Sequence, residues 1–131
     1  MKDVLKKWNL NVLDNNDKLY VEKLLNDSAG LTIILKKEKS DKKYLKIFFD
    51  DTLSYRNTNE SFLLKIWHTT QKENLGKTFY SVENSSYIDF FHEMTQKIYL
   101  DWDIIHYAIY TISECIDILS QVPPVISWEE E

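Results

Sequence analysis

The chain has 131 residues, of which 44% are hydrophobic and 14% aromatic, and its formal net charge is −5. This composition argues against an intrinsically disordered chain, and the length favours one globular domain, residues 1–131. Only two glycines are present, which excludes the glycine-rich phosphate loops of P-loop and dinucleotide-binding proteins.

The apolar runs and the first residues indicate the cellular compartment of the protein. No run approaches the roughly 20 apolar residues that a membrane-spanning helix needs. The first residues lack the apolar stretch and cleavage site of a signal peptide. The single cysteine, Cys115, cannot form an internal disulfide, and its place in a predicted strand favours a buried apolar side chain over a reactive thiol. These features predict a cytoplasmic protein.

Charge is distributed unevenly along the chain. Residues 1–65 contain 13 Lys and Arg against 10 Asp and Glu, a balance of +3. Residues 66–131 contain 3 Lys against 11 Asp and Glu, a balance of −8. Because an acidic half repels phosphate and attracts basic proteins, we expect a protein partner rather than nucleic acid or membrane. The alternative is that these carboxylates only keep the surface soluble.

Runs of β-branched and aromatic residues predict strands in the first half of the chain. Val4, Leu5 and Trp8 would instead share one helical face, which predicts a short helix within residues 2–13. The lysine-rich residues 36–43 are typical of a solvated hairpin tip. The strands are expected at residues 19–26, where a helix is the alternative, and at 31–35, 44–49 and 52–56.

The second half of the chain predicts the main helix. Before it we expect a polar loop, a strand, a second loop and a short strand, at residues 57–61, 62–69, 72–77 and 79–82. Asn84 or Ser85 is a suitable N-cap for a helix at about residues 85–97. Its apolar stripe recurs at helical spacing and would be buried, with Phe91 at its centre. The stripe consists of Tyr87, Phe91, Met94 and Ile98.

Residues 104–120 predict a C-terminal hairpin made of two apolar runs. A two-residue turn at 113–114 would place Tyr110 opposite Asp117. Because side chains alternate along a strand, His106, Tyr110 and Asp117 would share one face of the sheet.

The predicted fold class is α+β, an antiparallel β-sheet with the main helix packed on one face. An edge strand at 125–128 would follow two prolines, which cannot donate to a strand ladder. The sheet would contain residues 31–35, 44–49, 104–112 and 115–120.

Sequence motifs for the common catalytic chemistries are incomplete. His92 and Glu93 begin a zinc-protease helix motif, but Gln96 stands where the second histidine is required, so no metal site is expected. No Gly-x-Ser-x-Gly nucleophile elbow is present. His106 would lie too far along the hairpin to activate Cys115. We therefore predict no cofactor and no enzymatic activity.

Four polar residues are candidates for a pocket between helix and sheet, namely His106, Tyr110, Asp117 and Arg56. A buried Asp117 carboxylate is costly unless it is hydrogen-bonded, and Tyr110, facing it or diagonal to it, is a suitable donor. The alternatives are a solvent-exposed Asp117 or a binding or catalytic role. Arg56, the sole arginine, suits a salt bridge with Glu60 or residues 50–51, or the recognition of a ligand.

Asp101, Trp102 and Asp103 combine two carboxylates with an aromatic side chain just before the hairpin. This combination is typical of protein interfaces, so these residues are the candidate partner-binding site. The alternative is a loop tryptophan that packs into its own fold.

Several segments resemble a family of small, single-domain bacterial proteins that are similar in size and style to immunity proteins of bacterial toxin systems. The resemblance spans roughly residues 30–125 and contains no catalytic signature. It implies a toxin-neutralising role and assigns no site residue. The segments are residues 55–61, 85–91, 106–111, 115–120 and 123–124.

Three hypotheses for function follow. The first is a cytoplasmic protein-binding module, most concretely an immunity protein that neutralises a cognate basic toxin domain. The second is a small-molecule-binding or enzymatic α+β domain with a pocket between helix and sheet. The third is a structural subunit of a homo-oligomer.

Overall fold

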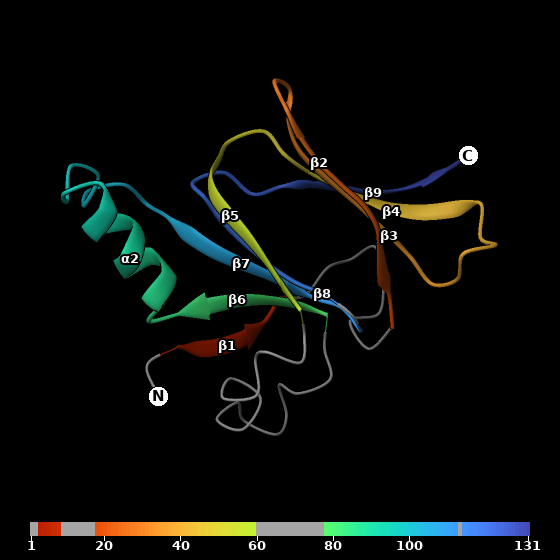
Figure 1. Ribbon diagram of the computed structural model, residues 1–131, viewed down its shortest axis with the longest axis horizontal. Coiled ribbons are helices and arrows are strands. Elements are labelled where there is room, and N and C mark those ends of the chain that lie inside the picture. The colour runs from red at the N-terminus through yellow and green to blue at the C-terminus, as the bar shows by residue number, and fades with distance from the viewer. Residues whose placement is uncertain (1–2, 9–17, 60–77, 113) are drawn as a thin grey trace.

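The computed structural model describes residues 3–8, 18–59, 78–112 and 114–131 (Figure 1). Within these residues the chain forms nine strands and one short helix. Among the described helices, none has the length and apolarity that crossing a membrane requires. The elements are β1 (Val4–Lys7), β2 (Tyr20–Asp27), β3 (Gly30–Lys36), β4 (Lys43–Phe49), β5 (Thr52–Asn59), β6 (Phe79–Glu83), α2 (Ser86–Met94), β7 (Ile105–Tyr110), β8 (Glu114–Ser120) and β9 (Val125–Glu130).

The strands form two antiparallel sheets rather than the single predicted sheet. The first sheet has the order β1-β6-β7-β8-β5, and the second has the order β2-β3-β4-β9. The predicted strands at 31–35 and 44–49 lie in the second sheet, whereas the hairpin β7–β8 lies in the first (Figure 1). Alternating sequence patterns predict strands but not their pairing, because pairing depends on side-chain packing across the whole fold.

Most of the individual strand predictions are confirmed. Strands occur at the positions expected for 19–26, 31–35, 44–49, 79–82 and 125–128. β5 runs through Asn59, so residues 57–59 belong to a strand rather than to the predicted polar loop. The predicted strand at 62–69 and loop at 72–77 lie outside the described residues.

The main core lies between the two sheets. Alternate residues of β3 and β4 point into it, as the two-residue period of a strand requires. Burial of these leucine, isoleucine and phenylalanine side chains is the main source of stability of such a sandwich. The core residues are Leu19, Leu31, Ile33, Leu35, Leu45, Ile47, Phe49, Phe79, Tyr107, Ile109, Ile116 and Ile118.

The hairpin β7–β8 has the predicted faces but a different register. Tyr110 pairs with Cys115, two positions away from the predicted partner Asp117. At the connection, Thr111 N donates to the Glu114 carbonyl at 2.8 Å, and Glu114 N donates to Thr111 Oγ1 at 3.1 Å. Thr111 therefore faces Glu114, so the turn lies one residue earlier in the chain than predicted, and Tyr110 and Asp117 become diagonal neighbours.

The predicted N-terminal helix is wrong within the described residues. Val4–Lys7 form β1, which pairs with β6. Pairing buries Leu5, and Trp8 packs edge-on against Phe79 with ring centroids 6.1 Å apart. This packing overrides the helical spacing of the apolar residues. Residues 9–13 lie outside the described residues.

Helix α2 is shorter than predicted, and Tyr87 is its one buried residue. Ser85 is confirmed as its N-cap, and Tyr87 is buried. Phe91 is only half-buried, Met94 is 66% exposed, and Ile98 lies beyond the helix end and is exposed. The prediction of a buried stripe centred on Phe91 is therefore wrong, because α2 lies at one end of the first sheet rather than across its face (Figure 1).

Candidate functional site

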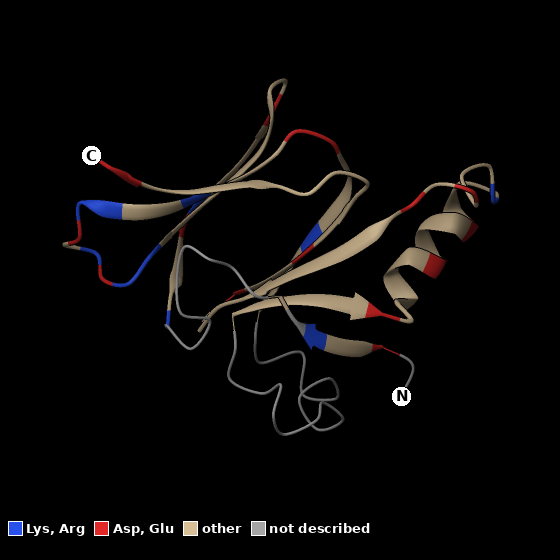
Figure 2. Ribbon diagram, turned by 180° about the vertical axis from the view of Figure 1, so that it is seen from behind, with Lys and Arg blue, Asp and Glu red and all other residues tan. Residues whose placement is uncertain are grey.

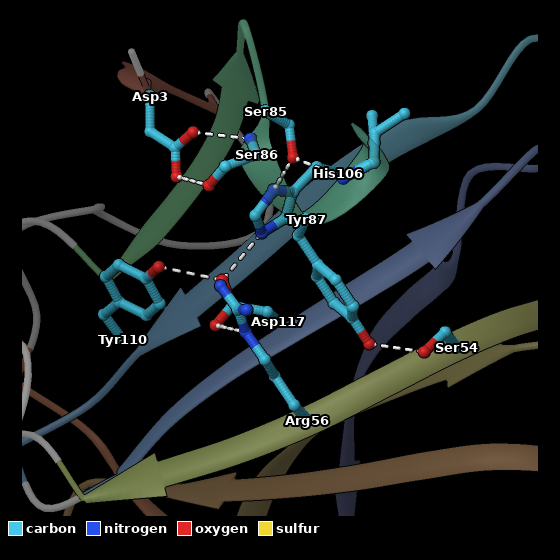
Figure 3. A network of polar contacts seen from close by, with 10 residues as sticks. Asp3, Ser54, Arg56, Ser85, Ser86, Tyr87, His106, Tyr110 and Asp117 are labelled. Carbon is cyan, nitrogen blue, oxygen red and sulfur yellow. Dashed lines mark hydrogen bonds and ion pairs between the residues drawn. The ribbon is translucent and has the colours of Figure 1, made fainter. Parts of the chain in front are cut away.

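The four predicted pocket residues meet on the outer face of the first sheet, which points away from the main core. β7 supplies His106 and Tyr110, β8 supplies Asp117, and β5 supplies Arg56 (Figure 3). Arg56 is the direct partner of Asp117 in the pairing of β5 with β8. A second apolar cluster on this face surrounds the polar group, and it contains Leu5, Tyr80, Val82, Ala108, Tyr110 and Cys115.

Asp117 is the centre of this polar network (Figure 3). Its Oδ1 accepts a hydrogen bond from the Tyr110 hydroxyl at 2.8 Å and lies 2.7 Å from His106 Nε2. Its Oδ2 accepts from Arg56 Nε at 3.1 Å. Burial acts to raise the pKa of Asp117, but the hydrogen bond and charge of His106, and then the Arg56 charge and the Tyr110 hydrogen bond, hold this pKa below its ordinary value. Asp117 is therefore a buried, ionised carboxylate.

Tyr110 completes the network as a permanent donor. Burial and then the Asp117 charge and hydrogen bond raise the pKa of its phenol far above its ordinary value. The hydroxyl therefore stays protonated and keeps donating to the carboxylate.

His106 connects this carboxylate to the start of α2. Its Nδ1 lies 2.7 Å from Ser85 Oγ, which also accepts from Ile88 N at 3.0 Å. A neutral imidazole donates from Nε2 to Asp117 and accepts from the Ser85 hydroxyl, whereas an imidazolium donates to both. His106 thus holds the N-cap of α2 on the sheet in either form. The sequence identified Ser85 only as a cap, since its bond to His106 joins residues 21 positions apart.

Arg56 covers the buried carboxylate at the surface. Its side chain is 44% exposed, whereas that of Asp117 is 1% exposed. The guanidinium carbon lies 4.3 Å from the centroid of the Tyr87 ring, and the Tyr87 hydroxyl is hydrogen-bonded to Ser54. The predicted pairing of Arg56 with residues 50–51 gives way to Asp117, since β5 lies directly beside β8. The other predicted partner, Glu60, lies outside the described residues.

Ser85, His106 and Asp117 form a chain of hydrogen bonds like the one that activates a serine in hydrolases. Here Ser85 is 5% exposed, and its Oγ accepts from the helix backbone. The hydroxyl is therefore committed to capping α2. We interpret the network as one that positions α2 on the sheet and satisfies a buried charge.

The candidate partner-binding residues lie apart from this network. Asp101, Trp102 and Asp103 are exposed in the turns that follow α2, and the Trp102 ring packs on Tyr99 with centroids 4.2 Å apart. Large apolar side chains remain exposed along α2, the turns after it and the start of β7, namely Phe90, Met94, Ile98, Leu100, Trp102 and Ile105. We group them with Asp89, Glu93, Asp101 and Asp103, the carboxylates of the same segment, and call this set the acidic apolar surface.

Several other described carboxylates of the acidic half lie away from this segment. β9 runs beside β4, so Glu129 pairs with Lys46 at 3.9 Å, and Glu131 pairs with Lys36 at 2.9 Å. The C-terminal glutamates thus partly neutralise the lysine-rich end of the second sheet, and Asp117 is buried. Among the described carboxylates of this half, Asp89, Glu93, Asp101 and Asp103 lie on α2 and in the turns after it, and Figure 2 shows acidic positions in this part of the chain.

The remaining sequence candidates are Cys115 and the possible metal ligands. The structure confirms that Cys115 is buried, and it takes part in no disulfide. Among the described residues, no group of three or more His, Cys, Asp or Glu side chains gathers where it could hold a metal ion.

Comparison with protein-family models, with curated proteins and with solved structures finds no match for this chain.

Proposed function

We propose that this chain is a cytoplasmic protein-binding module that masks a basic protein partner, most concretely an immunity protein that neutralises a cognate toxin domain. The observation that carries the proposal is the acidic apolar surface. Monomeric proteins seldom leave large apolar side chains exposed side by side, and such patches with a polar rim are typical of protein interfaces. The resemblance to small bacterial immunity proteins supports the same class of function.

The chemistry of this surface selects the kind of partner. Lys97 is the single cation between residues 83 and 105, whereas this segment contains the five carboxylates Glu83, Asp89, Glu93, Asp101 and Asp103. These charges attract a basic surface during approach and disfavour an anionic one. Trp102 and Met94 supply apolar area for the contact itself, because aromatic side chains and methionine are enriched in interface centres.

The partner is first isolated by affinity purification with this chain as bait. The test then measures the rate at which the purified partner associates with the chain. Asp101→Lys combined with Asp103→Lys should slow association by about tenfold or more at low ionic strength and weaken its salt dependence. Trp102→Ala should mainly speed dissociation, since a central aromatic contact is worth about 2 kcal/mol or more.

The matched control is Glu129→Lys combined with Glu130→Lys, which makes the same charge change on β9, outside the acidic apolar surface. A control that slows association as much as the variant with both Asp101→Lys and Asp103→Lys would contradict the proposed surface. Sedimentation of the chain alone is the second arm. Self-association abolished by Trp102→Ala would assign the surface to a second copy of the chain and overturn the proposal.

A further inference from the structure

Arg56 is held in one orientation by two contacts. Its Nε donates to the buried Asp117 carboxylate at 3.1 Å, and its guanidinium carbon lies over the Tyr87 ring, 4.3 Å from the centroid. The Tyr87 ring is itself fixed by burial and by the hydrogen bond of its hydroxyl to Ser54. The rotamer of a long side chain is thus selected before any ligand arrives.

The fixed guanidinium still has donors to offer. Arg56 uses only Nε on Asp117, and among the described residues no acceptor is hydrogen-bonded to its two Nη groups. The side chain is nearly half-exposed although its carboxylate partner is buried. Arg56 therefore combines two fixed contacts with terminal N–H groups that no described acceptor engages, on a side chain that is nearly half-exposed.

We propose that the Nη groups of Arg56 form a binding site for a carboxylate ligand. A guanidinium fork matches the two oxygens of a carboxylate, and a side chain already in place loses little freedom on binding. The Arg56–Asp117 pair has no net charge, and the chain as a whole carries −5. A singly charged, planar carboxylate therefore suits this site better than a doubly charged phosphate. This site is independent of the acidic apolar surface.

The test uses the fact that Arg56 is the sole arginine of the chain. In the full-length, nitrogen-15-labelled protein, the arginine Nε–H group gives one signal that needs no assignment. Sodium acetate should shift this signal in a saturable way at millimolar concentration, whereas sodium chloride at equal ionic strength should not. A linear shift that is equal for acetate and chloride would overturn the proposal.

Two variants sharpen the result. Arg56→Lys keeps the charge but loses the fork, so acetate affinity, followed by the backbone amides of residues 54–57, should fall by about tenfold or more. Lys39→Gln removes an exposed cation from the lysine-rich tip and should leave the affinity unchanged. Equal affinity in Arg56→Lys would contradict the site. If Arg56→Lys does not fold, the response of the arginine Nε–H signal to acetate and chloride in the unmodified chain still tests the proposal.

The ligand source is tested with two short peptides that differ only at the C-terminus. A peptide acid that binds more tightly than acetate would identify a polypeptide carboxylate, and one that binds more weakly would identify a small molecule. A peptide amide that binds as well as the acid would contradict carboxylate recognition.

Discussion

Replacing Asp117 with asparagine tests whether the buried polar network stabilises the fold. The amide oxygen can take the place of Oδ1, which faces Tyr110 and His106, but the amide nitrogen then replaces Oδ2. That nitrogen is a donor that meets the Arg56 Nε donor. The change thus removes the charge that three hydrogen bonds share and creates one repulsive contact.

The expected loss follows from burial and exposure. A hydrogen bond to a charged group contributes about 1.5–3 kcal/mol, and breaking a buried ion pair costs roughly 3–5 kcal/mol. Arg56 is nearly half-exposed, so its guanidinium can form hydrogen bonds with water once the carboxylate is gone. The lost Arg56 contact therefore contributes little to the total loss of stability. We expect Asp117→Asn to reduce the free energy of unfolding by about 2–4 kcal/mol at pH 7.

This loss should depend on pH. Because the folded pKa of Asp117 lies below its ordinary value of about 3.9, its contribution to stability is fully present above that value. The contribution is lost as pH falls below about 3.9 and through the folded pKa. The stability difference between the unmodified chain and Asp117→Asn should therefore shrink in acid.

Urea unfolding at a series of pH values measures this difference, provided that both proteins give the same denaturant slope. Asp101→Asn, an exposed carboxylate in the same half of the chain, is the control and should change stability by less than about 0.5 kcal/mol. A loss at Asp117 no larger than that of the control, or one that does not change with pH, would refute the reasoning.

Four further substitutions are tested by the same unfolding measurement. Ser85→Ala removes the N-cap of α2 and should cost about 1–2 kcal/mol, with a loss of helical circular dichroism; a loss below about 0.3 kcal/mol would mean that the cap is dispensable. Phe79→Ala in the main core should cost roughly 3–5 kcal/mol, and the half-buried Phe91→Ala clearly less; equal losses would contradict the burial of the two rings. Gly30→Ala should cost more than about 1 kcal/mol, because φ is +144° and a Cβ would lie 2.5 Å from the Phe49 carbonyl oxygen; a neutral effect would contradict this conformation.

Local properties of this protein could be predicted from its sequence alone. The two-residue period of 31–35 and 44–49 predicts strands because it matches the alternation of side chains in a strand. The same alternation places His106, Tyr110 and Asp117 on one face, even though the predicted register is wrong. Alternation is preserved when the register shifts by two residues, so the face survives an error in the turn.

Contacts between distant segments were decided only by the tertiary structure. The sequence contains the strands but does not state that β5 lies beside β8, which gives Arg56 its partner Asp117. Nor does it state that β1 pairs with β6, where an isolated segment with the same apolar spacing favours a helix. Pairing is selected by the total burial that two sheets achieve together, and no local pattern contains that quantity.

For the candidate surfaces too, some properties follow from the sequence and others only from the fold. The sequence determined that carboxylates and aromatic residues accompany each other near Trp102, since this is a property of neighbouring residues. The fold decided that α2 lies at one end of a sheet, which leaves Phe90 and Met94 exposed, and that the C-terminal glutamates lie beside the lysines of β3 and β4. Composition sets how many charges and apolar groups a chain has, but only folding decides which of them meet and which face the solvent.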